Sequence, residues 1–226
     1  MKAYIFDLDG TLFDSMGVWD EIDIAFLKKR GLDGPQNYVD KMSECGFEEG
    51  AAYTIKRFGL SERPEDLMAE WHAMAMDAYT HTVRLKPHAL EYLLQLKACG
   101  AKMGIATSLP PELHIPALKA NGIDQLFDAL SHSDEVGCGK TKPDVFLLAA
   151  ERLGTAPKDC IVFDDVMAAI VSAKGAGMTA YALYDASSAH LWDEIKQVSD
   201  GAFMDFSEVP LPDCEHQSNA QDSNRS

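Results

Sequence analysis

The sequence predicts an α/β fold in which a parallel sheet lies between layers of helices and an all-helical domain is inserted early in the chain. Short, uncharged runs of aromatic and β-branched residues, such as 4–6 and 160–163, are typical of strands buried on both faces. From residue 85 onward such runs alternate with amphipathic segments, which is the pattern of βαβ units. Between residues 15 and 84 apolar residues recur at helical spacing instead.

The first expected strand, 3–6, leads directly into two carboxylates. Asp7 and Asp9 are two residues apart, so on an extended chain their side chains point to the same side. Gly10 follows and suits a sharp exit from the strand. Two carboxylates this close repel each other unless one takes a proton or a cation lies between them. The structural alternative is an ordinary Asx turn, since Asp and Gly are common in turns.

Residues 15–84 are expected to form about four helices, enough for a small domain. Apolar residues recur at helical spacing within 19–26, 47–58 and 67–78. We interpret these aromatic and methionine stripes as hydrophobic core rather than as a cofactor site.

The remaining chain is expected to alternate helices and strands. The expected helices lie at 87–98, 111–121, 142–153 and 168–176, and the expected strands at 102–108, 127–131, 159–165 and 179–183. The tail from Asp213 to Ser226 is polar and lacks periodicity, so we expect it to be disordered.

The reactive side chains follow the ends of these predicted strands. They are Asp7, Asp9, Thr107, Asp164 and Asp165. Ligands of open α/β sheets bind at this carboxyl edge, and Lys140, just before a helix, could reach it too. Magnesium prefers carboxylates together with substrate phosphates. The edge therefore suggests phosphoryl transfer, with one Asp attacking phosphorus and another protonating the leaving group.

Four motifs resemble those of the haloacid dehalogenase (HAD) superfamily of phosphotransferases. They are Phe6-Asp7-Leu8-Asp9-Gly10-Thr11-Leu12, Ile105-Ala106-Thr107-Ser108, Gly139-Lys140-Thr141-Lys142-Pro143-Asp144, and Phe163-Asp164-Asp165 through Gly175-Ala176-Gly177-Met178. Each is short, but their order and rough spacing match over about 1–212. The helical block between the first two is similar to the cap of the β-phosphoglucomutase-like and phosphoglycolate-phosphatase-like branch.

The resemblance implies a three-layer Rossmann-like core at 1–14 and 85–212 with a helical cap domain at 15–84. It implies that Asp7 is the nucleophile and Asp9 the general acid and base. It assigns phosphate binding to Thr107, Ser108 and Lys140. It assigns Mg²⁺ to Asp7, the backbone carbonyl of Asp9, Asp164 and Asp165. The expected enzyme is a magnesium-dependent phosphatase that works through an aspartyl-phosphate.

Two positions depart from the family pattern. The family often has Pro after the motif-three lysine, where this chain has Thr141, so Lys142 is a rival to Lys140. The fourth motif often begins Glu-Asp-Ser, and here Asp164 is a shorter first acid, which could make its metal contact water-mediated.

The resemblance also implies that a cap loop near the start of the third cap helix faces the site. Here that loop would be Glu44-Cys45-Gly46-Phe47, followed by Glu48 and Glu49, and it contains no Lys or Arg. We expect this loop to select the substrate. A mutase must hold a second phosphate, usually with basic groups, so the acidic loop favours a phosphatase over the alternative of a β-phosphoglucomutase-type phosphomutase. A phospho-accepting signalling receiver is a weaker alternative, because a receiver needs neither a helical insert nor a second acid such as Asp9.

Composition narrows the partners. A net charge of -16 argues against nucleic-acid and anionic-membrane surfaces. Five cysteines without a C-x-x-C pair favour reduced thiols in a cytoplasmic protein. Charged residues at Lys2 and Asp7 occupy the place of a signal-peptide apolar region, and no apolar run approaches the ~20 residues of a membrane span. We expect a cytoplasmic monomer that acts on a small phosphorylated metabolite, a sugar or polyol phosphate.

Overall fold

The centre of the protein is a six-stranded parallel sheet. The structure, a computed structural model, describes residues 2–43 and 47–212. The strand order is β5-β4-β1-β6-β7-β8, and each neighbouring pair is parallel. The bounds are β1 Ala3–Phe6, β4 Lys102–Thr107, β5 Ala129–His132, β6 Cys160–Asp164, β7 Thr179–Leu183 and β8 Gly201–Phe203. The expected α/β fold with a parallel sheet is confirmed.

The first strand lies in the middle of the sheet because it is apolar on both faces. Tyr4 and Phe6 join one hydrophobic cluster, and Ala3 and Ile5 join the other. The Phe6 ring stacks on that of Phe163 in β6, with centroids 4.7 Å apart. Pairing with β4 on one side and β6 on the other places the residues after β1 at the centre of the carboxyl edge.

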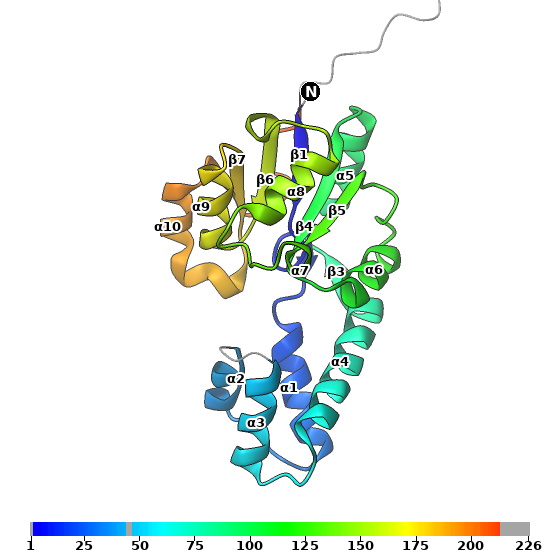
Figure 1. Ribbon diagram of the computed structural model, residues 1–226, viewed down its shortest axis with the longest axis vertical. Helices are drawn as coiled ribbons and strands as arrows, with labels where there is room; N and C mark the ends of the chain where they lie inside the picture. Colours follow the sequence, from blue (N-terminus) through cyan, green and yellow to red (C-terminus); the bar gives the residue numbers. More distant parts are fainter. Residues whose placement is uncertain (1, 44–46, 213–226) are drawn as a thin grey trace, which may run out of the picture.

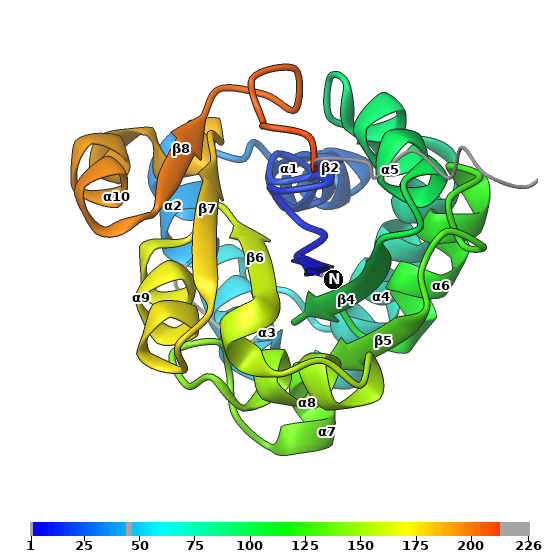
Figure 2. The same cartoon turned by 90° about the horizontal axis from the view of Figure 1, so that it is seen from above.

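Helices cover both faces of the sheet (Figure 2). On one face lie α5 (Ala89–Ala98) and α6 (Pro111–Ala120), which bury Leu93, Leu96 and Leu113. On the other lie α8 (Asp144–Arg152), α9 (Met167–Gly175) and α10 (Trp192–Val198). These bury Phe146, Ile170 and Ile195 against the second cluster. A short helix, α7 (Ser133–Val136), follows β5.

Four helices form a separate block beyond the carboxyl edge of the sheet (Figure 1). They are α1 (Val18–Lys29), α2 (Gln36–Ser43), α3 (Phe47–Phe58) and α4 (Pro64–His81). Phe26 packs edge-on against Trp71, with ring centroids 5.3 Å apart. The chain enters through β2 (Phe13–Asp14) and leaves through β3 (Arg84–Leu85), which pair antiparallel. Both connections to the block therefore lie side by side.

Some expectations differ from the structure or fall outside it. The two-residue strands β2 and β3, the three-residue β8 and the 3₁₀ turn at Ala186–Leu191 were not predicted, because such short elements carry no readable period.

Cys99 is disulfide-bonded, so the expectation of reduced thiols is wrong there, whereas Cys138 and Cys160 are free. The expected disordered tail, 213–226, lies outside the described residues. Within the described residues, no helix combines the length and apolarity needed to cross a membrane.

Candidate active site

A cavity of about 350 Å³ opens at the carboxyl edge, lined by residues of both the sheet and the helical block. Most of the predicted site residues line it, namely Asp7, Asp9, Thr107, Ser108, Lys140 and Asp165. Asp164 is fully buried beside it and contacts Lys140. Lys142 is exposed and does not line the cavity, so the structure brings Lys140, not its rival, to the site.

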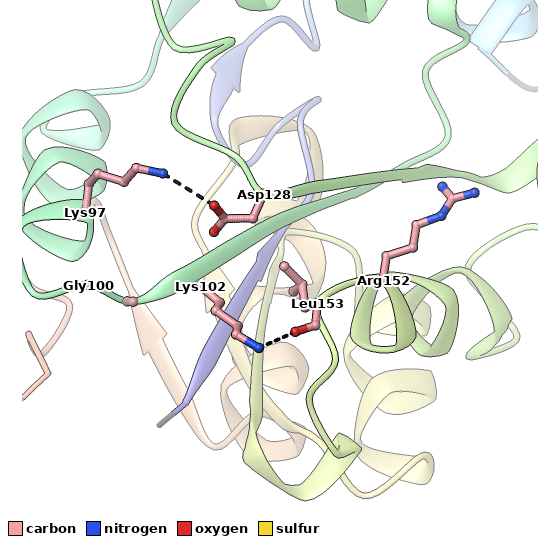
Figure 3. A pocket seen from close by; sticks show the side chains of 7 residues that line it. Lys97, Gly100, Lys102, Asp128, Arg152 and Leu153 are labelled. Carbon is pink, nitrogen blue, oxygen red and sulfur yellow. Dashed lines mark hydrogen bonds and ion pairs between the residues drawn. The ribbon is translucent and has the colours of Figure 1, made fainter.

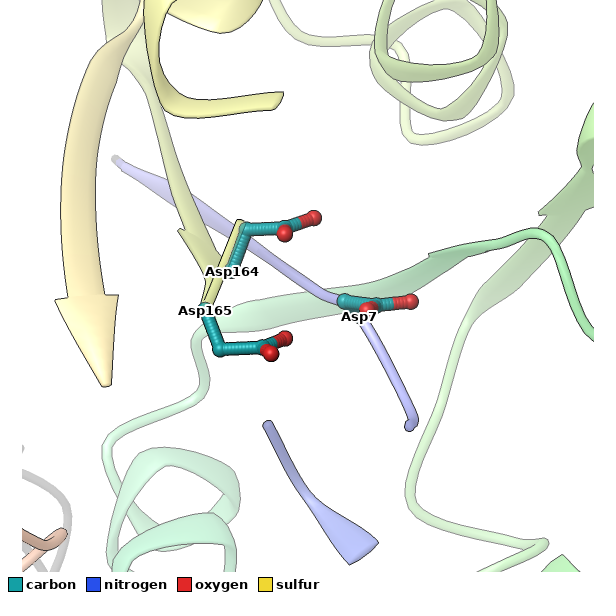
Figure 4. Close-up of side chains that lie close together, drawn as sticks. All are labelled: Asp7, Asp164 and Asp165. Carbon is teal, nitrogen blue, oxygen red and sulfur yellow. The ribbon is translucent and has the colours of Figure 1, made fainter. Parts of the chain in front are cut away.

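Three carboxylates share one small space at the ends of the two central strands. Asp7 follows β1, Asp164 ends β6 and Asp165 comes next in the chain. One oxygen of each lies within 4.8 Å of the others, and Figure 4 shows all three pointing into the same space. All three residues are buried. The side chain of Asp9 does not belong to this group, so only its backbone carbonyl remains as a predicted ligand.

Lys140 compensates part of this charge. Its Nζ contacts Oδ1 of Asp7 and lies 2.9 Å from Oδ2 of Asp164. Burial alone would lower the pKa of Lys140, but the charges of Asp164 and Asp7 outweigh it, and the pKa is raised. Burial raises the pKa of Asp7 well above its usual range, and the charge of Lys140 opposes that rise. One cation thus faces three buried carboxylates.

Asp165 carries the least compensated oxygen. The hydroxyl of Thr11 donates to its Oδ1 at 3.1 Å, whereas its Oδ2 is buried with no hydrogen-bond partner in the described part of the chain. Burial, followed by the charge of Asp164, raises its pKa to about 7. Gly10 has φ +74°, and a Cβ there would lie 2.5 Å from Oδ2. The glycine therefore leaves room for this carboxylate.

The residues fit a hard divalent cation. The donors are oxygens of three carboxylates, which Mg²⁺ and Ca²⁺ prefer over nitrogen or sulfur. A buried carboxylate oxygen without a partner is costly unless a cation or a proton compensates it. Asp7, Asp164 and Asp165 could hold such a cation.

Asp9 has a different environment. Its Oδ1 accepts hydrogen bonds from the Ser15 hydroxyl at 2.6 Å and from the Tyr79 hydroxyl at 2.8 Å. Burial raises the pKa of Asp9, and these two donors oppose the rise. Ser15 lies between β2 and α1, and Tyr79 lies in α4. Both chain segments that join the helical block to the sheet therefore reach this carboxyl group.

Sequence reasoning missed Ser15 and Tyr79. The available signal was the stripe Leu67, Trp71, Ala75 and Tyr79, all buried, in which one phenol ends an otherwise apolar row. Trp19, interpreted as core, both packs against the core and lines the cavity. That interpretation was incomplete, because a stripe does not show where a helix end meets another domain.

The end of β4 supplies the hydroxyl groups. Thr107 is buried, and its Oγ1 accepts a hydrogen bond from the backbone N–H of Leu109 at 3.0 Å. The Ser108 hydroxyl lies 3.0 Å from that of Ser133. Thr107, Ser108 and Lys140 all line the cavity and could approach one anion.

Most of the predicted substrate loop lies outside the residues that the structure describes. Glu44, Cys45 and Gly46 lie outside the described residues, and the side chain of Phe47, the first residue of α3, is not described. The described residues that the helical block and its entry segment bring to the cavity are Ser15, Met16, Trp19 and Tyr79.

The model of the haloacid dehalogenase-like hydrolase family matches residues 1–177. A phosphorylated carbohydrates phosphatase of Thermotoga maritima is 25% identical over 178 residues, covering 79% of this chain and 82% of that protein. Hexitol phosphatase A of Escherichia coli is 28% identical over 180 residues, covering 78% and 80%.

Solved structures share the whole fold. A Thermotoga maritima protein described as a β-phosphoglucomutase candidate superimposes with a TM-score of 0.81 at 23% identity, covering 90% of this chain and 94% of that one. These matches confirm the resemblance carried by the four motifs, and with it the prediction of a phosphatase-type enzyme.

Proposed function

The chain belongs to the haloacid dehalogenase-like hydrolase family, and from that premise we propose that it is a magnesium-dependent phosphatase of a phosphorylated sugar or polyol. The observation that carries the proposal is the cluster of Asp7, Asp164 and Asp165 around Lys140 at the carboxyl edge. It combines a candidate nucleophile, a cation site and a fixed positive charge within one cavity.

Asp7 is the proposed nucleophile. Its carboxylate oxygen attacks phosphorus, an acyl-phosphate bond forms, and the bond from phosphorus to the alcohol oxygen breaks. Lys140, already in contact with Asp7, would face the phosphoryl oxygens together with the hydroxyls of Thr107 and Ser108. Mg²⁺, held by Asp7, Asp164, Asp165 and the backbone carbonyl of Asp9, would neutralise phosphoryl charge.

Asp9 is the proposed acid and base. Protonated Asp9 gives its proton to the departing alcohol oxygen, and it later takes a proton from the water that hydrolyses the acyl-phosphate. Burial raises its pKa, which favours the protonated form that the first step needs. Ser15 and Tyr79 hold the carboxyl group in place from the side of the helical block.

The block at 15–84 would act as a cap over the core at 1–14 and 85–212. Cap closure would exclude water until the phosphoryl group has moved to Asp7. Met16, Trp19 and Val166 give the cavity an apolar wall, which suits the C–H faces of an uncharged leaving group. The named activities of the carbohydrate and hexitol phosphatases support a sugar or polyol in that place.

A phosphomutase is the second candidate, favoured by the fold shared with the β-phosphoglucomutase candidate. A mutase needs cations for a second phosphate. Among the described residues that line the cavity, Lys140 is the single basic side chain, and it already faces Asp7 and Asp164. Glu48 and Glu49 at the start of α3 are exposed acids. The phosphatase is therefore the better-supported function. Cytoplasmic location and a monomeric state stay predictions.

A phosphate-release screen tests the proposal. Sugar, polyol, nucleotide and short-acid phosphates are assayed with Mg²⁺ and then with a chelator. We expect fast, Mg²⁺-dependent release from sugar or polyol phosphates and none from Asp7→Asn. Asp14→Asn, which changes an exposed acid in β2, is the matched control and should be fully active. Activity that requires a bisphosphate activator would favour the mutase, and release that persists with the chelator would contradict the metal site.

A further inference from the structure

A buried ion pair lies where the helical block joins the sheet. Lys86 follows β3, and Asp185 follows β7 by two residues. Nζ of Lys86 lies 2.7 Å from Oδ2 of Asp185, and the two side chains are only 10% and 6% exposed. A surface pair contributes little, but breaking a buried pair leaves an uncompensated charge and is strongly destabilising. This pair therefore holds the segment after β3 firmly to the loop after β7.

Each residue of the pair makes further hydrogen bonds. Nζ of Lys86 also donates to the carbonyl of Tyr184 at 2.7 Å, and its backbone N–H donates to the carbonyl of Leu12 at 2.8 Å. Oδ1 of Asp185 accepts hydrogen bonds from the N–H and the hydroxyl of Ser187 at 2.9 and 2.6 Å. Lys86 thus ties together β3, the turn before β2 and the loop after β7.

That turn is also the support of Asp165. Leu12 follows Thr11, whose hydroxyl holds Oδ1 of Asp165, and Gly10 on the same turn leaves room for Oδ2. The charges of Asp185 and Lys86 act on the pKa of Asp165 in opposite directions, so the pair lies within electrostatic range of that carboxylate. The hydrogen bond to Leu12 belongs to the backbone of Lys86, and the side chain anchors that backbone to the loop after β7 through Asp185 and the Tyr184 carbonyl. Loss of this anchor would therefore act on Asp165 by loosening the segment that holds Leu12 and Thr11.

We propose that Lys86 and Asp185 are positioning residues for Asp165. The pair fixes the backbone of Lys86 to the loop after β7, and that backbone holds Leu12 in the turn 10–12. Thr11 of the turn then aims the Asp165 carboxylate into the space that it shares with Asp7 and Asp164. Neither residue lines the cavity, so neither touches the substrate. The inference rests on the proposed function, because it takes Asp165 as a Mg²⁺ ligand.

Calorimetric titration of the substrate-free protein with Mg²⁺ tests the inference, with kcat and KM measured in parallel. Lys86→Met should raise the Kd for Mg²⁺ about tenfold, as for other partners that orient metal ligands, and lower kcat more than it raises KM. Lys86→Arg, which keeps the charge, should recover most of the affinity. Lys102→Met is the matched control, because Lys102 also donates to a carbonyl, that of Leu153 at 2.6 Å, but at the opposite edge of the sheet (Figure 3). Its Kd for Mg²⁺ should stay within about twofold of wild type.

A paired substitution covers the case in which Lys86→Met does not fold. Lys86→Met/Asp185→Asn removes both charges together, and Asn can still accept the hydrogen bond from Ser187. It should show the same loss of about tenfold in Mg²⁺ affinity. Unchanged or tighter binding in this variant would overturn the positioning role. A wild type that binds no Mg²⁺ would overturn the metal site itself, so the two failures are distinguishable.

Discussion

The charged side chains at the two edges of the central sheet differ in how fully neighbouring groups compensate them. At the amino edge, Lys97, Lys102 and Arg152 line a surface hollow (Figure 3). Each of the three also donates to a backbone carbonyl. Lys97 also pairs with Asp128 at 3.4 Å. At the carboxyl edge, three buried carboxylates lie together, and Lys140 contacts two of them, Asp7 and Asp164. Oδ2 of Asp165 has no hydrogen-bond partner among the described residues.

The comparison distinguishes charged groups that stabilise the fold from charged groups that are available to bind a ligand. Cations that bond to the carbonyls at helix and strand ends stabilise the fold and have little capacity left for a ligand. Buried carboxylates that their neighbours leave uncompensated raise the free energy of the empty site. A bound cation compensates their charge and removes that cost. A basic hollow is therefore not by itself an anion site, whereas the acidic cluster is the better indication of function.

Asp7→Asn tests the carboxyl edge with the largest expected effect. An amide is a poor nucleophile, so kcat should fall by at least about 10³-fold. The variant should bind Mg²⁺ more weakly but stay folded, because it removes a buried charge. Steady-state phosphate release measures the loss. Activity near that of wild type would remove Asp7 from the nucleophile role.

Tyr79→Phe tests whether the helical block positions the acid. Without the phenol, Asp9 loses one of the two hydrogen bonds that it accepts from described side chains and is less well aimed, so kcat for a sugar phosphate should fall about tenfold. The loss should be smaller for nitrophenyl phosphate, whose good leaving group needs little acid. Tyr92→Phe removes another buried phenol, which contacts Pro210 at 3.4 Å, and is the control. Equal losses on both substrates would count against the role.

Asp23 offers a buried carboxyl away from either edge. It lies in α1, is 8% exposed, and burial raises its pKa from 3.8 to about 7. The folded protein then binds a proton that the unfolded chain has lost, so the free energy of unfolding falls as pH rises from about 4 to about 7. The buried Asp7, Asp9 and Asp165 contribute to the same slope, so Asp23→Asn should make it shallower without abolishing it, and should add on the order of 2 kcal/mol at pH 8.

Urea unfolding at pH 5 and pH 8, with a chelator present, measures the effect of Asp23. Asp33→Asn, at an exposed position, serves as the control and should keep the wild-type slope. Identical pH slopes for wild type and Asp23→Asn would show that Asp23 ionises freely in the folded protein.

Lys97→Met should have the smallest effect and completes the comparison. Lys97 is 43% exposed, and its partners are the Leu126 carbonyl and Asp128. We expect kcat, KM and the Kd for Mg²⁺ to change by less than about twofold, with a small loss of stability. A larger change in phosphate release would mean that the amino edge takes part in function.

The sheet and the reactive residues could be predicted because their signals are local. An apolar strand followed by Asp7, and a second followed by Asp164 and Asp165, place those acids at one edge by topology alone. The alternation of faces did not keep Asp7 and Asp9 together, because the strand ends at Phe6 and the chain already turns at Leu8, which accepts hydrogen bonds from the N–H groups of Thr11 and Phe13. The pattern gave the residues at the edge but not their partners.

The partners depend on contacts between distant segments. Tyr79 meets Asp9 across 70 positions, and Lys86 meets Asp185 only once β7 has joined the sheet. The sequence favoured Lys140 through the resemblance and left Lys142 as a rival. The fold adds that Lys140 lines the cavity and contacts Asp7, whereas Lys142 is exposed and lies outside the cavity lining. Periodicity reports which face of a helix is apolar, and it cannot report which polar groups meet at the end of that helix.

Acid-quenching the enzyme during turnover and reducing it with borohydride would test the central claim most directly. Borohydride converts an aspartyl-phosphate to homoserine, which mass spectrometry of the peptide can locate. We predict homoserine at position 7 in the wild type with substrate and Mg²⁺, and none in Asp7→Asn or with a chelator. Steady phosphate release with no change at Asp7, or modification of a different carboxylate, would contradict Asp7 as the nucleophile.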